Sequence, residues 1–369
     1  MGQRRRRVWV LVALVLTVAS AVLAGPAATA QAQIDVPWFK AGAVYRGNFP
    51  DPDVVRFGHT WYAYATNTGG AYVPVMTSTD LRTWVARPAY NPGASISTDP
   101  WFNDALPRVA PWAARSGPGK WDTNAWAPTV RWTGGHYVMA YVAPRSLSPY
   151  KQCISVATSA SPLGPFTDTT RAPLVCSSDP RGSIDPALYL DARGTPFLVW
   201  KNEGVPGCCP TRLWSRQLAP GGTAFAPGSL PHNLLTTAQK WEGNLIEGPS
   251  LVGYAGRLYL FYSANNWSSP AYATGYAICA SALGPCTRPT TSPLLASGSG
   301  INGPGGPTGF VDLAGHLRLG YAAWNAPWSS YQSYPACTTT RTCGQAQRFF
   351  HVATLTADSR GLLHVASRG

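Results

Sequence analysis

The sequence predicts an all-β fold, namely a five-bladed β-propeller with a funnel along its axis. Runs with a helical period are absent, while short alternating or aromatic runs bounded by Gly, Pro, Asn and Ser recur along the chain. Glycine and proline are plentiful, at 37 and 34 of 369 residues. Five of the runs resemble one another, at separations of 77, 59, 62 and 59 residues; they start at His59, His136, Thr195, Arg257 and His316.

The five runs have the features of propeller blades. Each follows a turn that usually contains glycine, and several are followed by a second strand of small and polar residues, as in CISVATSASPLGPF. A repeat of about 60 residues built in this way is typical of a blade. Five such sheets packed radially share their apolar faces and leave only short edges. A β-sandwich with insertions is the alternative fold.

The start of the chain has the pattern of an export signal. Four arginines at 4–7 precede an apolar run at 8–23, and small residues that fit a cleavage site follow. We therefore expect a signal peptide over 1–32 and a single propeller domain over 33–369. An uncleaved membrane anchor is the alternative, but the apolar run is short for a span of about 20 residues. After cleavage we expect a secreted, extracellular monomer that is not bound to a membrane.

The charge of the chain does not indicate a nucleic-acid partner. The net charge is +13, but the basic residues after the first seven are scattered and form no Lys/Arg run. A nucleic-acid-binding protein is expected to gather them into a stripe or patch. The charge therefore indicates solubility or loose attraction to acidic cell-wall material.

Eight cysteines in an exported chain favour disulfide bonds. No CxxC pair with matching histidines indicates a zinc site. Two pairs are close enough in sequence to close a hairpin or loop, and a third is plausible. The remaining two cysteines form a vicinal pair or bond elsewhere. The pairs in this order are Cys279–Cys286, Cys337–Cys343, Cys153–Cys176 and Cys208–Cys209.

A polar, aromatic or glycine-rich cluster beside a proline precedes each of the five repeated runs. Because the inner strands of a propeller line its funnel, residues at their entrances are expected to meet around the axis. Three of the clusters contain a carboxylate, namely Asp51, Asp185 and Glu247, and Glu247 is one of only three glutamates in the chain. Asp-Pro is also an ordinary turn pair. The repetition favours a site at the mouth of the funnel over three unrelated turns.

Converging carboxylates beside aromatic residues favour glycoside hydrolysis. That reaction needs one carboxylic acid to protonate the leaving oxygen and one carboxylate on the opposite face of the sugar ring. Trp126, in the second cluster, can stack against a sugar face. Asn124 and Phe49, from the second and first clusters, join it as candidate substrate-binding residues. We regard Asp53 as structural, because strand alternation turns it away from Asp51.

Four segments in order and at blade spacing resemble the signature segments of glycoside hydrolase family 43. They are FPDPDVV, WAPTV, SIDPALYLDARGTPFLVW and IEGPSLV…GRLYLFYSAN, and the resemblance covers nearly the whole chain from about Gly47. Members of this family are five-bladed propellers that hydrolyse arabinofuranosides and xylosides with inversion. The resemblance implies that Asp51 is the general base, Glu247 the general acid and Asp185 the residue that tunes and orients the acid. Inversion implies carboxyl groups roughly 6.5–9.5 Å apart.

One segment departs from the family pattern. Many members carry a histidine after the glycine-proline cluster of the fifth repeat, where it helps to hold an ion or water on the axis. Here the segment is GPGGPTGF, with Gly305 and Gly306 and no histidine. We therefore expect that no cofactor is required, and the sequence does not favour an axial calcium.

These observations predict a secreted inverting glycoside hydrolase whose partner is a plant cell-wall polysaccharide or oligosaccharide. We expect it to release L-arabinofuranosyl residues, with D-xylosyl residues or arabinan as the other substrates. A related propeller enzyme acting on other furanosyl sugars is one alternative. A sugar-binding propeller without catalysis is the other, and it predicts unchanged sugar binding in Glu247→Gln.

Overall fold

The computed structural model describes residues 42–86, 102–117, 123–205, 209–325, 328–331 and 346–368. The expected signal peptide at 1–32 lies outside these residues. Within them the regular structure is β-strand, apart from one short 3₁₀ turn, η1 (Lys240–Glu242). No helix in the described part of the chain is long and apolar enough to cross a membrane.

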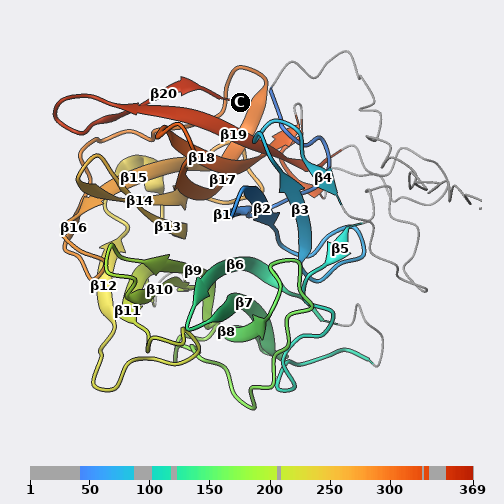
Figure 1. Ribbon diagram of the computed structural model, residues 1–369. Coiled ribbons are helices and arrows are strands. Elements are labelled where there is room, and N and C mark those ends of the chain that lie inside the picture. Colours follow the sequence, from blue (N-terminus) through green and yellow to red (C-terminus); the bar gives the residue numbers. More distant parts are fainter. Residues whose placement is uncertain are drawn as a thin grey trace, which may run out of the picture. The chain divides into compact units, whose positions relative to one another are not determined.

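The strands form five antiparallel sheets that follow one another along the chain (Figure 1). The first contains β1 (Asp53–Phe57), β2 (Thr60–Tyr64), β3 (Pro74–Ser78) and β4 (Val85–Ala86), with β5 (Asn103–Asp104) paired to β3. The second contains β6 (Trp126–Thr133), β7 (His136–Leu147) and β8 (Tyr150–Ser159). The third contains β9 (Ser183–Leu190), β10 (Pro196–Asn202), β11 (Arg212–Gln217) and β12 (His232–Thr236). The fourth contains β13 (Ile246–Tyr254), β14 (Arg257–Ala264), β15 (Ala273–Cys279) and β16 (Cys286–Thr287), and the fifth β17 (Ile301–Val311), β18 (Leu317–Asn325), β19 (Arg348–Ala357) and β20 (Leu363–Ser367).

The first strands of the five sheets form a closed ring. β1 contacts β6, β6 contacts β9, β9 contacts β13, β13 contacts β17, and β17 contacts β1 again. Each of these strands is also the inner edge of its sheet, with the remaining strands stacked outward (Figure 1). The prediction of an all-β, five-bladed propeller is therefore confirmed.

The five repeated runs of the sequence are the second strands of the blades, β2, β7, β10, β14 and β18. A second strand has a hydrogen-bonded neighbour on both sides and a neighbouring blade on both faces. Its residues are therefore buried almost without alternation, as in β14, where the last six of eight residues are buried. Continuous apolar and aromatic runs are what such a strand requires.

Each interface between neighbouring blades holds one hydrophobic cluster. The first and second blades share a cluster that includes Tyr64 and Tyr141, and the other pairs are filled in the same way. The last interface joins the fifth blade to the first, where the rings of Trp61 and Phe310 lie 5.1 Å apart. The segment before β1 also pairs with β19, since the Val44 amide donates to the Phe350 carbonyl at 2.9 Å.

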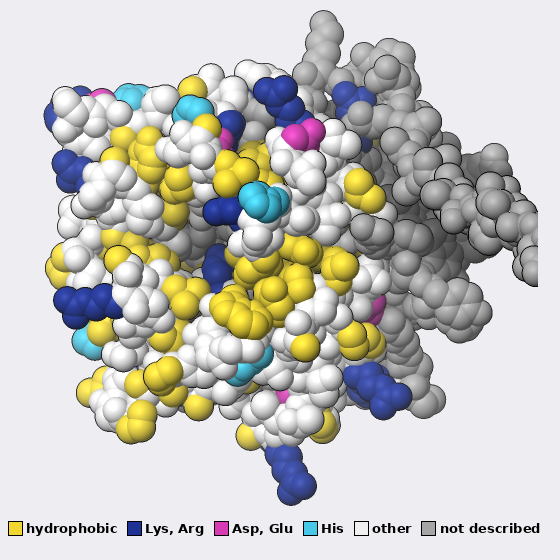
Figure 2. All heavy atoms as spheres, in the orientation of Figure 1, with side chains coloured by type: hydrophobic (Ala, Val, Ile, Leu, Met, Phe, Trp, Pro, Cys, Tyr) yellow, Lys and Arg dark blue, Asp and Glu magenta, His cyan; other side chains and the backbone are white. Residues whose placement is uncertain are grey.

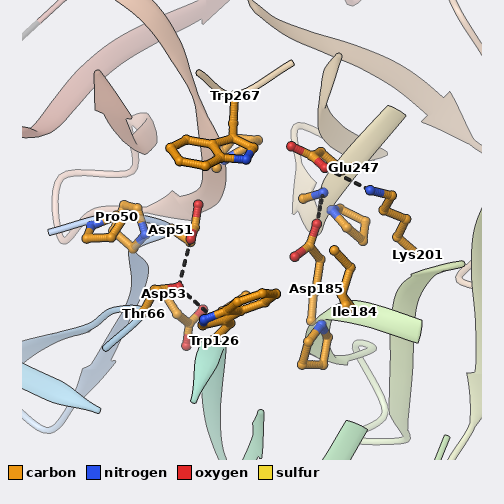
Figure 3. A pocket seen from close by; sticks show the side chains of 18 of the residues that line it. Pro50, Asp51, Asp53, Thr66, Trp126, Ile184, Asp185, Lys201, Glu247 and Trp267 are labelled. Carbon is orange, nitrogen blue, oxygen red and sulfur yellow. Dashed lines mark hydrogen bonds and ion pairs between the residues drawn. The ribbon is translucent and has the colours of Figure 1, made fainter. Parts of the chain in front are cut away.

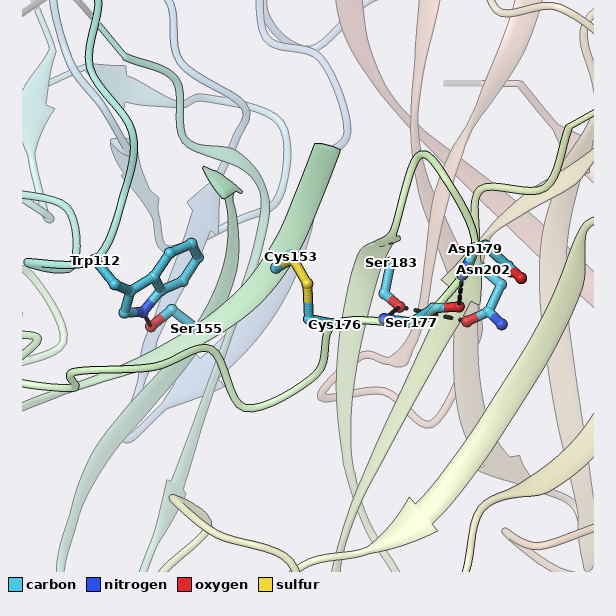
Figure 4. The surroundings of a disulfide bond; sticks show 8 residues. All are labelled: Trp112, Cys153, Ser155, Cys176, Ser177, Asp179, Ser183 and Asn202. Carbon is cyan, nitrogen blue, oxygen red and sulfur yellow. Dashed lines mark hydrogen bonds between the residues drawn. A yellow bond between two sulfur atoms is a disulfide. The ribbon is translucent and has the colours of Figure 1, made fainter. Parts of the chain in front are cut away.

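Two of the expected disulfides are present in the described residues. Cys153–Cys176 ties β8 to the segment that leads into β9 (Figure 4), and Cys279–Cys286 joins β15 to β16. Both predictions are confirmed. Cys209 is also disulfide-bonded. Cys208 and the expected pair Cys337–Cys343 lie outside the described residues.

Candidate active site

The five inner strands share one unusual feature of the backbone. In every blade a residue directly before a proline has a positive φ, a conformation that costs a residue other than glycine about 1–3 kcal/mol. Strain of this size persists only where the surroundings hold it, and it gathers at functional sites. The five residues and their φ values are Asp51 (54°), Ala127 (41°), Asp185 (52°), Gly248 (57°) and Gly306 (61°).

The three predicted acids line one cavity of about 620 Å³. Asp51 comes from the turn before β1, Asp185 from β9 and Glu247 from β13, so that three different blades contribute. In Figure 3, Asp51 lies on one side of the cavity while Asp185 and Glu247 lie on the other. Figure 2 shows this face hollowed near its middle, with basic and hydrophobic side chains at the hollow.

Both oxygens of the Asp51 carboxylate accept hydrogen bonds. Thr66 Oγ1 donates to Oδ2 at 2.7 Å, and Arg348 Nη1 donates to Oδ1 at 2.9 Å. The Thr66 hydroxyl in turn accepts from the Ala127 amide at 2.9 Å, which ties the first blade to the second. The Asp51 side chain remains 29% exposed, so water reaches it from the cavity. Asp51 is therefore a fixed carboxylate beside accessible water.

Asp185 and Glu247 form an interacting pair of carboxyl groups. The Gly248 amide, next to Glu247, donates to Asp185 Oδ2 at 2.9 Å. Burial and the negative charge of Glu247 raise the pKa of Asp185 to about 8, although the nearby Lys201 ammonium acts against this shift. Asp185 therefore holds a proton at neutral pH when Glu247 is ionised. Such a pair can keep one proton on this side of the cavity.

Glu247 is also bound by two donors that the sequence analysis missed. Lys201 Nζ donates to Oε2 at 2.8 Å, and the Tyr272 hydroxyl donates to Oε1 at 2.8 Å. Lys201 lies at the end of β10, and its ammonium also contacts Glu203 at 2.9 Å. Burial alone would lower the pKa of Lys201, but the charges of Glu247, Glu203 and Asp185 raise it, so the ammonium stays charged.

The sequence held one weak signal for these missed residues. Lys201 in PFLVWKN and Arg348 in RFFHV are single cations in otherwise apolar strands. A cation in such a strand is buried and must find an anionic partner. The sequence does not say which acid that partner is, because the partners lie 46 and 297 residues away.

The remaining predicted site residues lie in different surroundings. Trp126 lines the cavity. The Asn124 amide contacts the Tyr150 hydroxyl at 3.5 Å, and Asn124 is not among the residues that line the cavity. Phe49 is fully buried between the first and fifth blades, packed against Phe102 and Phe350, so its ring does not reach the cavity.

Asp53 has a clear structural part. It is buried and pairs with Arg131 at 2.9 Å, and it accepts a hydrogen bond from the Val130 amide at 2.8 Å. These contacts join the first blade to the second.

A second aromatic wall faces Trp126 across the cavity. Trp267 lies on the loop between β14 and β15 and is 40% exposed. Its ring stacks on the buried Trp324 at 5.9 Å, and Tyr331 packs against both rings. Figure 3 shows Trp267 and Trp126 on opposite sides of the acids. The cavity thus has carboxyl groups on one pair of opposite walls and indole rings on the other pair.

A sequence model of the Glycosyl hydrolases family 43 matches residues 42–347. The chain belongs to this family. The resemblance stated from the motifs is confirmed, and the protein is a glycoside hydrolase.

Two relatives of this family-43 glycoside hydrolase are named for activity on arabinan and arabinoxylan. It is 24% identical over 309 residues to the extracellular endo-α-(1→5)-L-arabinanase 1 of Bacillus subtilis (strain 168). The aligned region covers 76% of this chain and 87% of that protein. It is 29% identical over 201 residues to the arabinoxylan arabinofuranohydrolase of the same organism, covering 50% of this chain and 38% of that one. A solved thermostable family-43 glycoside hydrolase has a TM-score of 0.65 at 24% identity, covering 87% of this chain and 94% of that one.

The residues of this family-43 protein do not fit an axial ion held by a histidine. A Cβ atom on Gly305 would lie 2.0 Å from Tyr272 Cε1, and one on Gly306 would lie 2.9 Å from Asp51 Oδ1. Neither position has room for a side chain. Among the described residues, no group of three or more His, Cys, Asp and Glu could hold a metal ion.

Proposed function

We propose that this protein is a secreted, inverting glycoside hydrolase that releases L-arabinofuranosyl or D-xylosyl residues from plant cell-wall polysaccharide. The observation that carries the proposal is the meeting of Asp51, Asp185 and Glu247, from three blades, around one cavity. Carboxyl groups on both sides of a sugar-sized space are what glycoside hydrolysis requires.

In the proposed reaction, Asp51 is the general base. Its carboxylate takes a proton from a water molecule while the water oxygen attacks the anomeric carbon. The contacts from Arg348 and Thr66 fix the carboxylate for this task. Glu247 protonates the glycosidic oxygen as its bond to the anomeric carbon breaks. A single displacement of this kind inverts the anomeric configuration.

Asp185 is the proposed tuning residue for the acid. Its raised pKa, about 8, supports a proton reserve beside Glu247. The Gly248 amide, which lies next to Glu247 in the chain, binds Asp185 and so links the orientation of the two groups.

Trp126 and Trp267 are the proposed sugar-binding walls. The C–H faces of a sugar ring pack well on an indole ring. Trp267 suits this role because Trp324 and Tyr331 hold its ring while a large part of it stays exposed. Phe49 is not carried into this set, since it is buried away from the cavity.

Cleavage within an arabinan chain is the second candidate activity. Aromatic walls on two opposite sides of the acids support the binding of sugars on both sides of the scissile bond. The name of the Bacillus subtilis endo-arabinanase relative points in the same direction.

Two observations support export. The name of that relative includes "extracellular", and this chain contains two disulfides in its described part.

Product analysis tests this proposal. The purified protein is incubated with branched arabinan, linear arabinan and arabinoxylan, and the products are separated by chromatography. Monomeric arabinose from side chains supports the arabinofuranosidase, xylose the xylosidase, and oligosaccharides from linear arabinan the endo-acting enzyme. Proton NMR of the first product tells inversion from retention. Binding without any release would support the sugar-binding propeller and overturn the proposal.

A further inference from the structure

We propose that Lys201 and Glu203 are positioning residues that set the proton affinity and the orientation of Glu247. This inference rests on the proposed role of Glu247 as the general acid. It goes further by assigning a function to a buried cation that the reaction itself does not need.

The burial of Lys201 indicates a specific role. Its side chain is 1% exposed, and its ammonium contacts Glu247 Oε2 at 2.8 Å and Glu203 Oε2 at 2.9 Å. A buried lysine is costly unless it is paired, so its position requires both carboxylates. Glu203 is 21% exposed and lines the same cavity. Lys201 therefore links Glu203, at the wall of the cavity, to Glu247.

Lys201 determines which oxygen of Glu247 can carry a proton. An ammonium has three donors and no acceptor, so the oxygen that it contacts acts as an acceptor, which favours the proton on the other oxygen. The proton of the acid form is then on Oε1, where the Tyr272 hydroxyl can either donate or accept. Lys201 and Tyr272 together fix the carboxyl group in one orientation. The oxygen that donates to the leaving group is thereby selected.

The charges of Lys201 and Glu203 have opposite effects on how readily Glu247 holds a proton. The ammonium of Lys201 favours ionised Glu247, while the carboxylate of Glu203 offsets that ammonium. The other charged or titratable groups near Glu247 are the same in every variant. They are Tyr272 from the fourth blade, Asp185 from the third, and Asp51 of the first blade with its partner Arg348 of the fifth.

The test is the pH dependence of kcat/KM for the polysaccharide or oligosaccharide that the wild type hydrolyses. A general acid is active when protonated, so activity falls as pH rises through the pKa of the acid in the free enzyme. Lys201→Met should move this basic limb to higher pH by about one unit or more. Glu203→Gln should move it to lower pH, because the ammonium is then less neutralised. Shifts of opposite sign are not expected from a loss of packing.

Two controls separate this inference from its alternatives. Lys240→Met removes an exposed lysine and should leave the limb unmoved. With a dinitrophenyl glycoside of the released sugar, whose leaving group needs little protonation, the shifts should largely disappear. If Lys201→Met does not fold, as judged by circular dichroism, Glu203→Gln still tests the inference.

The outcomes distinguish the inference from the proposed function. One result overturns the inference alone. In it, the wild type is active and Glu247→Gln is inactive, but the basic limb of the pH profile does not move in Lys201→Met or in Glu203→Gln. Limbs that both move in the same direction also overturn it. A wild type without hydrolytic activity on any of the three polysaccharides overturns the proposed function itself.

Discussion

The three acids differ in their surroundings, and these differences fit the roles proposed for them. Asp51 is held by an arginine and a hydroxyl, Glu247 by a lysine and a tyrosine hydroxyl, and Asp185 by a backbone amide. Burial and the negative charge of Glu247 raise the pKa of Asp185 to about 8. Environments that separate carboxyl groups in this way are how one site supplies both an acid and a base.

The raised pKa of Asp185 has a consequence for stability. Between about pH 4 and about pH 8 the folded protein holds a proton on Asp185 that the unfolded chain has released. The free energy of unfolding therefore falls as pH rises through this window, by about 1–2 kcal/mol after allowance for the partial exposure of the group. Asp185→Asn removes this dependence. Urea unfolding at about pH 5 and about pH 8 should show the variant gaining stability relative to wild type at the higher pH.

Asp80 offers a control for this prediction. Burial alone would raise its pKa, but hydrogen bonds from the Thr83 and Arg82 amides lower it. Its charge is therefore present at both pH values, and Asp80→Asn should lose the same stability at each. Equal pH dependence in wild type and Asp185→Asn would contradict the assignment.

The repeated element of this fold is a residue with positive φ, directly before a proline, at the inner strand of each blade. It lies just before β1 and within β6, β9, β13 and β17. In the fifth blade the residue is Gly306, and the space that a side chain would need is taken by Asp51. The strand geometry of one blade therefore constrains the acid of another.

This constraint predicts the effect of a single methyl group. Gly306→Ala should lower kcat by about tenfold or more, because Asp51 must move and small displacements of a catalytic group are costly. Gly315→Ala is the control. Gly315 also has a positive φ, +82°, but nothing lies within 4 Å of the added atom. Both variants should lose about 1 kcal/mol of stability from backbone strain. Full activity in Gly306→Ala would show that Asp51 tolerates the displacement.

The repeated elements explain which parts could be predicted from sequence. The second strands were visible because they are buried on both faces, and the acids because the residue–proline entrance recurs at blade spacing. Lys201 and Arg348 were missed, since a single cation in an apolar strand gives no spacing signal toward its partner. Phe49 was wrongly grouped with the cavity residues by its place in the cluster, because the chain turns between it and Asp51 and sends its ring into the core.

At the scale of the whole molecule, the site exists only because the ring of blades closes. Asp51 of the first blade is paired with Arg348 of the fifth, and Lys201 of the third is paired with Glu247 of the fourth. Apolar clusters fill all five interfaces between these blades. The distance between the proposed base and the proposed acid is thus set by packing across several blades, which no single segment of sequence encodes.

The proposal that acids from separate blades act on one glycosidic bond is tested most directly by the kinetics of Glu247→Gln on two substrates. On the natural oligosaccharide, loss of the general acid should lower kcat/KM by about 10²–10⁴-fold. On the dinitrophenyl glycoside of the same sugar, whose leaving group needs little protonation, the loss should be far smaller. Equal losses on both substrates, or an oligosaccharide rate within about threefold of wild type, would contradict the assignment.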